Sequence, residues 1–268
     1  MKPLSAIPAA VMQNIRGVFC DIDDTLTSEG KLTARAYAAL ERLRAHGKLV
    51  IPITGRPAGW CDHIARMWPA DAVVGENGAF YFYYDAAARK LMQRFLFDAA
   101  TRAANRERMH AVRDRILREV PGSALASDQH YREADLAIDF CEDVPRLPLA
   151  AVDKIVALMQ AAGMTAKISS IHVNGWFGDY DKLGMTRTLM RERYGVDLAR
   201  DEAQYLFVGD SPNDAPMFGF FSNSVGVANV ADFGARLTAA PAFVTSRRSG
   251  DGFVELVDCL LNGATGIN

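Results

Sequence analysis

The chain has 268 residues, half of them hydrophobic, and its 30 Lys and Arg residues are nearly balanced by 32 Asp and Glu residues. This length and apolar content suffice for one large domain or two small ones with a real core. Because no basic excess is present to neutralise a phosphate backbone, the composition argues against nucleic acid as the main partner.

Cysteine spacing and hydropathy indicate a reduced, soluble protein. The four cysteines, Cys20, Cys61, Cys141 and Cys259, form no C-x-x-C pair and have no metal-ligand spacing, which favours a cytoplasmic location. The segment 1–11 contains two prolines and lacks the apolar centre of a signal peptide. No uncharged apolar run approaches the length that spans a bilayer. We therefore expect a cytoplasmic protein with no membrane partner.

The first third of the chain alternates predicted strands and helices. Short apolar runs predict strands at 18–22, 49–53 and 71–74, and helices are predicted at 34–46 and up to Ala65. Strands that are separated by helices imply parallel βαβ units.

The middle of the chain has a different pattern, which predicts a second α+β unit with antiparallel strands, inserted into the first. Aromatic-rich runs predict a hairpin of two strands at 79–84 and 91–97. The other elements expected in this unit are a long helix at 99–120, a strand at 136–140, a helix at 149–160, and strands at 165–169 and 171–176.

The last third returns to the βα alternation. A helix is predicted at 181–194 and a strand at 205–208, followed by a loop at 209–214 that opens another helix. Short strands are expected at 224–227 and 243–244, and a closing helix at 253–261. The sequence thus predicts an α/β protein.

An acidic motif follows the first strand. In Asp21-Ile22-Asp23-Asp24-Thr25, the carboxylates at positions 21 and 23 share one side of an extended segment. Ligands of open α/β sheets bind beyond the carboxyl ends of the strands. There, one carboxylate can attack phosphorus while the other moves a proton, with a metal ion holding the anions together. The alternative is an acidic turn that merely closes a strand.

Three other segments carry polar groups suited to phosphate or metal. Thr54 offers a hydroxyl after the second strand, although a Thr-Gly turn is common there. Lys182 begins a helix and can point at an anion, although a lone lysine is usually a surface residue. The loop Gly209-Asp210-Ser211-Pro212-Asn213-Asp214 offers only oxygen ligands, which suit Mg²⁺.

Together these motifs resemble the haloacid dehalogenase-like hydrolases. Asp21-x-Asp23-x-Thr25, Thr54-Gly55-Arg56, Lys182 and the loop 209–214 occur in the order typical of that family, and the resemblance covers the whole chain. It implies a Rossmann-like, doubly wound parallel-sheet core, in agreement with the alternation above. The sequence departs from the usual form of the family's lysine motif, because Lys182 is followed by Leu183-Gly184 rather than directly by glycine.

The resemblance also implies roles for individual residues. Asp21 would be the nucleophile that forms an aspartyl-phosphate, and Asp23 the acid/base. Thr54 and Lys182 would hold the transferring phosphoryl group. The implied Mg²⁺ ligands are Asp21, the backbone carbonyl of Asp23 and Asp210, with Asn213 and Asp214 around them. A second aspartate at position 23 is typical of the phosphatases and phosphomutases of the family.

The insertion between Thr54 and Lys182 resembles a C2B-type cap of the sugar phosphatases in subfamily IIB. We expect a catalytic core at 1–82 and 181–268 and an α+β cap at 83–180. Other predicted substrate-binding residues are Gly55, Arg56, Glu76, Asn77, His172, Asn174 and Asn213. His172 and Asn174 alternate on one strand, where ordinary cap packing is the alternative.

The resulting hypothesis is a Mg²⁺-dependent phosphatase of a small phosphorylated metabolite, most simply a sugar phosphate. A phosphomutase would pass the phosphoryl group to a second sugar hydroxyl instead of water. A non-catalytic sugar-phosphate sensor is the alternative of a different class, and the intact set of motif residues disfavours it. The sequence carries no signal of oligomeric state.

Overall fold

The computed structural model describes residues 1–262 of the chain. Its main sheet has the strand order β1-β15-β14-β13-β2-β5, and each neighbouring pair runs parallel. The strands are β1 (Lys2–Pro3), β2 (Gly17–Cys20), β5 (Leu49–Pro52), β13 (Tyr205–Gly209), β14 (Ser224–Gly226) and β15 (Phe243–Val244). This pairing confirms the predicted parallel arrangement.

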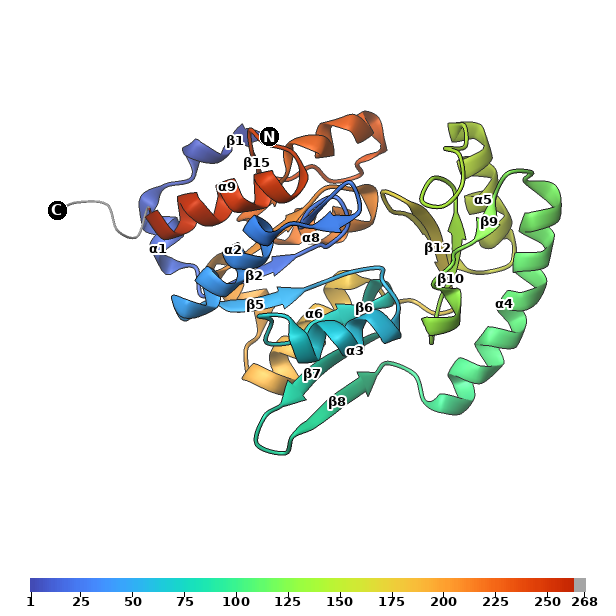
Figure 1. Cartoon of the computed structure of the whole chain (residues 1–268), viewed down its shortest axis with the longest axis horizontal. Coiled ribbons are helices and arrows are strands. Elements are labelled where there is room, and N and C mark those ends of the chain that lie inside the picture. Colours follow the sequence, from blue (N-terminus) through green and yellow to red (C-terminus); the bar gives the residue numbers. More distant parts are fainter. Residues whose placement is uncertain (263–268) are drawn as a thin grey trace.

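Helices cover both faces of the main sheet (Figure 1). In β2, Val18 and Cys20 belong to the apolar cluster that contains residues of α2 and α9, whereas Phe19 belongs to the cluster that contains residues of α6 and α8. Successive side chains of a strand point to opposite faces, so both faces are buried. The predicted doubly wound core is thereby confirmed. The helices are α1 (Ala9–Asn14), α2 (Ala34–Ala45), α6 (Lys182–Tyr194), α7 (Leu198–Asp201), α8 (Ala215–Phe220) and α9 (Ser249–Asn262).

A second, antiparallel sheet extends the core, and it corrects one expectation. It consists of β6 (Val73–Gly75), β7 (Phe80–Asp85) and β8 (Lys90–Phe95), and a parallel bridge between Ile53 and Val74 connects it to the end of β5. The expected boundary between residues 82 and 83 falls inside β7. The hairpin predicted for the inserted unit packs instead on α3 (Ala58–Met67) of the core.

The reason for this difference is packing. Phe80 and Phe82 are fully buried and stack on each other with a centroid distance of 4.3 Å. An aromatic hairpin that pairs with β6 continues the core, although its local pattern resembles that of the antiparallel unit. We propose that the core comprises 1–97 and 181–262 of the described residues and that the cap comprises 98–180.

The cap is an antiparallel sheet covered by two helices (Figure 1). Its strand order is β11-β12-β10-β9. Gly175 lies against Met159 of α5, so alternate residues of the same strand, His172 and Asn174, face away from that helix and toward the core. The elements are α4 (Ala99–Glu119), β9 (Ala124–Leu125), β10 (Leu136–Asp139), α5 (Leu149–Ala161), β11 (Thr165–Ile168) and β12 (His172–Trp176).

A few elements differ from the prediction. A small hairpin of β3 (Thr27–Ser28) and β4 (Lys31–Leu32) follows the acidic motif, and α9 begins four residues earlier than expected. Two glycines in the first turn of α9 concealed its start, because glycine disfavours helix interiors. None of the helices in the part of the chain that the structure describes is both long enough and apolar enough to cross a membrane.

Candidate active site

Four strand ends bring the polar motifs together at one edge of the main sheet. Asp21 follows β2, Thr54 follows β5, Asp210 follows β13, and Asn229 follows β14. Because these strands are parallel neighbours, their carboxyl ends lie side by side. The topology therefore assembles side chains that are separated by as many as about two hundred residues in the sequence.

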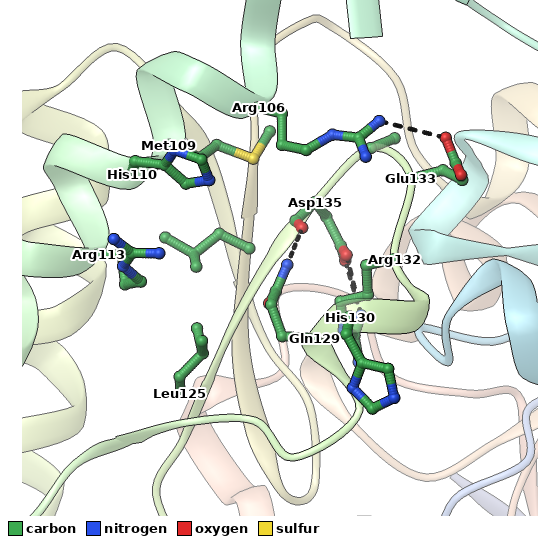
Figure 2. A pocket seen from close by; sticks show the side chains of 12 residues that line it. Arg106, Met109, His110, Arg113, Leu125, Gln129, His130, Arg132, Glu133 and Asp135 are labelled. Atoms are coloured by element: carbon green, nitrogen blue, oxygen red, sulfur yellow. Dashed lines mark hydrogen bonds and ion pairs between the residues drawn. The ribbon is translucent and has the colours of Figure 1, made fainter. Parts of the chain in front are cut away.

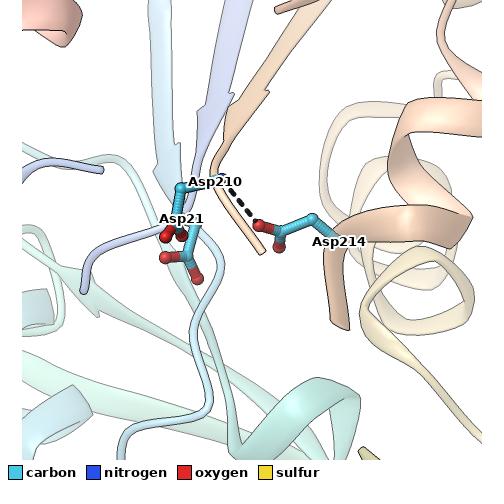
Figure 3. A group of neighbouring side chains, drawn as sticks. All are labelled: Asp21, Asp210 and Asp214. Atoms are coloured by element: carbon cyan, nitrogen blue, oxygen red, sulfur yellow. Dashed lines mark hydrogen bonds between the residues drawn. The ribbon is translucent and has the colours of Figure 1, made fainter. Parts of the chain in front are cut away.

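Three buried carboxylates form a cluster at this edge (Figure 3). One oxygen each of Asp21, Asp210 and Asp214 lies within 4.8 Å of the others. The backbone N–H groups of Asp210 and Ser211 donate to Oδ2 of Asp214 at 3.0 and 3.2 Å. This close approach of the Asp214 side chain to the backbone requires glycine at position 209, since a Cβ there would lie 2.4 Å from Asp214 Oδ2.

Lys182 is the cation of the cluster. Its Nζ donates to Asp21 Oδ1 at 2.5 Å and to Asp214 Oδ1 at 2.7 Å, and the side chain is 1% exposed. The two carboxylates outweigh the effect of burial and raise the pKa of Lys182, so it stays charged. An ammonium has three protons, so one remains after these two contacts.

The position of Lys182 depends on a close backbone contact. Gly78, at φ +110°, lies against the start of α6, where an added Cβ would be 2.0 Å from the carbonyl oxygen of Asp181. Asp181 caps α6 by accepting from the N–H of Gly184 at 2.7 Å. The turn η2 (Glu76–Gly78) thus packs directly on the helix turn that carries the lysine.

The charges of the cluster fit a hard divalent cation. Three carboxylates and one ammonium leave two negative charges in a buried site. Burial and the neighbouring carboxylates raise the pKa values of Asp21 and Asp210, against the opposing effect of Lys182. Oxygen-only donors of this kind suit Mg²⁺.

Two neutral side chains orient Asp210. Thr25 Oγ1 donates to Asp210 Oδ1 at 3.3 Å, and Asn229 Nδ2 donates to Oδ2 at 3.2 Å. Asn229 in turn accepts from the N–H of Ser249 at 2.8 Å. These contacts hold both oxygens of the Asp210 carboxylate in place.

Thr54 is oriented by its own loop. It is fully buried, and its Oγ1 accepts the N–H of Arg56 at 2.9 Å. Its hydroxyl proton has no assigned acceptor among residues 1–262, so it remains available to a ligand oxygen. The loop after β5 therefore leaves a buried hydroxyl donor at the end of this strand.

Asp23 points toward the cap, unlike Asp21. Its carboxylate accepts from Arg56 Nε at 3.0 Å and from Arg56 Nη2 at 2.8 Å. Arg56 also reaches two cap carboxylates, Asp128 at 3.3 Å and Glu142 at 2.7 Å. The interface between core and cap is thus closed over Asp23 by an ion-pair network.

A narrow cavity of about 10 Å³ lies under this network. Its lining includes most of the predicted site residues: Asp21, Asp23, Gly55, Arg56, His172, Asn174 and Asn213, together with Ser169, Ser170, Ile171 and Ser211. Asn174 Nδ2 donates to Asp135 Oδ2 at 3.0 Å, and Asn213 Nδ2 donates to Asn77 Oδ1 at 3.2 Å. A larger cavity of about 600 Å³ adjoins the site on the side of Asp210 and Asp24.

Glu76 does not lie in this cavity, in contrast to its prediction as a substrate contact. It is fully buried, with φ +42°. Its carboxylate accepts the backbone N–H groups of Ala58, Glu133, Ala134 and Asp135 at 2.6 to 3.2 Å. Glu76 therefore ties the core to the cap loop 133–135. The local sequence carries no signal for this, because the three donors in the cap are 57 to 59 residues away.

Glu76 makes stability depend on pH. Burial, with help from Asp135, raises its pKa from 4.5 to about 8, while Arg132 opposes the shift. Between these pH values the unfolded chain has lost the proton and the folded protein keeps it. Wild-type stability relative to Glu76→Gln should then fall with rising pH, by on the order of 1 kcal/mol per pH unit. Urea unfolding of both proteins from pH 5 to 9 measures this, and parallel curves would show that Glu76 stays ionised.

The cap side of the interface is also ordered by ion pairs (Figure 2). Arg132 is fully buried, donates to Asp128 at 3.1 Å and Asp135 at 2.9 Å, and reaches the carbonyl oxygen of Gly55 at 2.8 Å. A cavity of about 200 Å³ separates this segment from α4, and Arg106 pairs with Glu133 at its rim.

Several residues of the site were not predicted: Asn229, Asp128, Arg132 and Glu142. Asn229 follows a core strand, and this position in the sequence could have indicated that it belongs to the site. The other three lie in cap loops, where the sequence shows only ordinary charged residues.

Residues 18–102 match the family model described as haloacid dehalogenase-like hydrolase. A phosphoglycolate phosphatase of Methanospirillum hungatei is 26% identical over 253 residues, covering 91% of this chain and 95% of that protein. Among solved structures, the sucrose-phosphatase of Synechocystis, in complex with sucrose and phosphate, has a TM-score of 0.62 at 15% identity, covering 92% of this chain and 98% of that one. The subclass IIB sugar phosphatase BT4131 has a TM-score of 0.60 at 13% identity, covering 93% and 99%.

The capped, Rossmann-like fold is shared with the sucrose-phosphatase and with the subclass IIB sugar phosphatase. The chain shares its motif order and, over residues 18–102, its sequence pattern with the haloacid dehalogenase-like hydrolases, as predicted. It is an enzyme of the phosphoric monoester hydrolase class. Phosphatases of this family generally use a divalent metal, for which the buried Asp cluster is suited.

Proposed function

We propose that this enzyme is a Mg²⁺-dependent phosphatase of a small phosphorylated metabolite, with a sugar phosphate as the substrate class. The observation that carries the proposal is the environment of Asp21. Lys182 holds Oδ1 of this carboxylate at 2.5 Å, and no donor is assigned to Oδ2 among the described residues. One oxygen is therefore fixed and the other is free to attack phosphorus.

In the first step, Asp21 Oδ2 attacks the phosphorus of the substrate and forms the aspartyl-phosphate. The bond from phosphorus to the leaving oxygen breaks, and Asp23 gives that oxygen a proton. Lys182 and the Thr54 hydroxyl hold the equatorial oxygens, on which the charge of the transition state is spread.

In the second step, Asp23 takes a proton from water, and the resulting hydroxide attacks phosphorus. The bond from phosphorus to Asp21 breaks, which releases inorganic phosphate and restores the carboxylate. The narrow cavity under the cap limits the access of water between the two steps, so the cap must move for substrate and product exchange.

For the metal, the proposed ligands are Asp21, the carbonyl oxygen of Asp23 and Asp210, with Asp214 around them. Bound Mg²⁺ would neutralise the two excess charges of the cluster and polarise the phosphoryl oxygens. Thr25 and Asn229 would keep the Asp210 carboxylate in the orientation that it needs for this role. Asn213 lies in the loop 209–214, which also carries Asp210, and would contact the substrate.

The substrate class is supported by two lines of evidence. Two similar structures are a sugar phosphatase and a sucrose-phosphatase. The cavity above Asp23 is lined by groups that bind hydroxyls, among them Ser169, His172 and Asn174. Phosphoglycolate, the substrate in the name of the sequence relative, carries a carboxylate instead and belongs in the same test.

The test is phosphate release from a panel of phosphorylated sugars, glycerates, glycolate and nucleotides, with Mg²⁺ and with EDTA. We expect one sugar phosphate to be the best substrate, and EDTA to lower its turnover at least about 100-fold, since such a metal is worth several kcal/mol. Added Mg²⁺ should restore the activity, which controls for damage by the chelator.

Other outcomes would contradict the proposal in different ways. Turnover that survives EDTA would exclude the metal role. Phosphoglycolate as the best substrate would refute the sugar phosphate. Transfer of phosphate within a sugar, with no release, would indicate a phosphomutase.

A further inference from the structure

Arg56 links four segments of the molecule at the interface between core and cap. Its guanidinium contacts Asp23 from the core and both Asp128 and Glu142 from the cap, and its side chain is 5% exposed. Asp23 is the residue that the proposed function makes the acid/base, so Arg56 connects it directly to two loops of the cap.

The contact between Arg56 and Asp23 fixes the orientation of the carboxylate. Nε lies 3.0 Å from both carboxylate oxygens, and Nη2 lies 2.8 Å from Oδ1. A guanidinium is planar, and its donors have a fixed geometry, so it sets both the position and the plane of its partner. The ring of Trp60 lies 4.3 Å from the Arg56 Cζ and helps to define that plane.

Glu142 is itself held in place. Its N–H donates to Asp139 Oδ1 at 2.7 Å at the end of β10, and His172 Nε2 lies 2.9 Å from its Oε2. Although burial alone acts in the opposite direction, His172 and Arg56 lower the pKa of Glu142 to about 2, so it is ionised under assay conditions. The cap therefore presents a fixed negative charge to Arg56.

Asp128 is the second anchor. Arg132 Nε and Nη2 each lie 3.1 Å from Asp128 Oδ1, and Arg132 also donates to the carbonyl oxygen of Gly55, the neighbour of Arg56. Both anchors belong to the cap, whereas Arg56 and Asp23 belong to the core. A cap in this position therefore supplies both anchors of Arg56.

We propose that Arg56 is a positioning residue for Asp23, and that Glu142 and Asp128 hold Arg56 in place, so that proton transfer to the leaving group is assembled by closure of the cap. This inference rests on the proposed function. In the step concerned, a proton passes from the Asp23 carboxyl to the leaving oxygen as the bond between that oxygen and phosphorus breaks. Arg56 itself exchanges no proton.

The test compares two substrates that differ in their need for a proton. p-Nitrophenyl phosphate releases a stable phenolate, whereas benzyl phosphate releases an alkoxide that must be protonated. Since kcat/KM reports the steps up to the first irreversible one, it isolates the transfer to Asp21 from the common hydrolysis step. The measured quantity is the ratio of kcat/KM for the two substrates.

In Glu142→Gln we expect kcat/KM for benzyl phosphate to fall about 10- to 100-fold, at or below the lower end of the usual contribution of general acid catalysis. The value for p-nitrophenyl phosphate should change less than about 3-fold by the same argument. Arg56→Lys should shift the ratio in the same direction, because an ammonium cannot bridge three carboxylates. Asp23→Asn removes the proposed acid itself and should therefore give the largest change in the ratio of kcat/KM.

Glu133→Gln is the matched control, since Glu133 is a cap carboxylate whose side chain pairs with Arg106, away from Asp23. Its ratio should equal that of the wild type. An equal loss for both substrates in Glu142→Gln would show a merely structural role and overturn the inference, as would an unchanged ratio. If Glu142→Gln does not fold, Asp128→Asn replaces it. Failure of the proposed function is a separate result, since the wild type would then hydrolyse neither substrate.

Discussion

Asp21→Asn should lower phosphatase activity by at least about 10⁴-fold while the protein remains folded, as expected for loss of a nucleophile. An amide has nearly the size of the carboxylate but cannot attack phosphorus to form a stable acyl-phosphate. The loss should appear with every substrate, p-nitrophenyl phosphate included, because a good leaving group does not replace a missing nucleophile. Phosphate release over long incubations measures the residual rate.

The covalent intermediate can be observed directly. In a single turnover with ³²P-labelled substrate, acid quenching should leave label on the wild-type protein, and hydroxylamine should remove it, as it does from acyl-phosphates. The Asp21→Asn protein should carry no label.

Asp197→Asn is the control for the substitution itself. Asp197 caps α7 through the N–H of Ala199, a role that asparagine fills equally well. Its activity should match the wild type. Turnover by Asp21→Asn within about 10-fold of the wild type would refute nucleophilic catalysis at this residue, since a nucleophile contributes far more.

Lys182→Met should lower turnover about 10³-fold, the upper range for loss of one transition-state donor. It should also destabilise the protein by about 3 kcal/mol, because two buried carboxylates lose their cation. Methionine preserves the length and the apolar stem of lysine. Activity measurements and urea unfolding in the presence of EDTA quantify the two effects separately.

A double variant separates catalysis from folding at this site. Asp214→Asn removes one of the two uncompensated charges and retains an oxygen that accepts the N–H groups of Asp210 and Ser211. Lys182→Met/Asp214→Asn should therefore regain stability relative to Lys182→Met but no activity. If activity returned with stability, Lys182 would be a structural counter-charge and not a contact of the phosphoryl group.

The motifs at the strand ends were predictable, because each is local. A short apolar run followed by Asp21 or by Gly209 identifies a buried strand and the turn after it. Parallel βαβ units then bring those turns to one edge, so the sequence predicted the cluster of Asp21, Lys182 and Asp210. Lys182 contacts Asp21 and Asp214 although Leu183 breaks the usual form of its motif, because the N-cap Asp181 defines the first turn of α6.

Residues at the contact between core and cap were not predictable in the same way. Glu76 was expected to touch substrate, but its oxygens accept N–H groups of a loop more than fifty residues away. The hairpin of β7 and β8 has an antiparallel aromatic pattern that fits either unit, and pairing with β6 decides in favour of the core.

The sequence by itself determined the α/β core, the inserted cap and the residues at the strand ends, because strand and helix periodicity, capping and glycine turns depend on neighbours a few positions apart. Only the tertiary structure decided that Arg56 meets Glu142, 86 positions away, and that Asp23 faces this pair. Such contacts depend on where a whole domain comes to rest on another. Charged residues in the cap loops look alike until that placement selects the few that face the site.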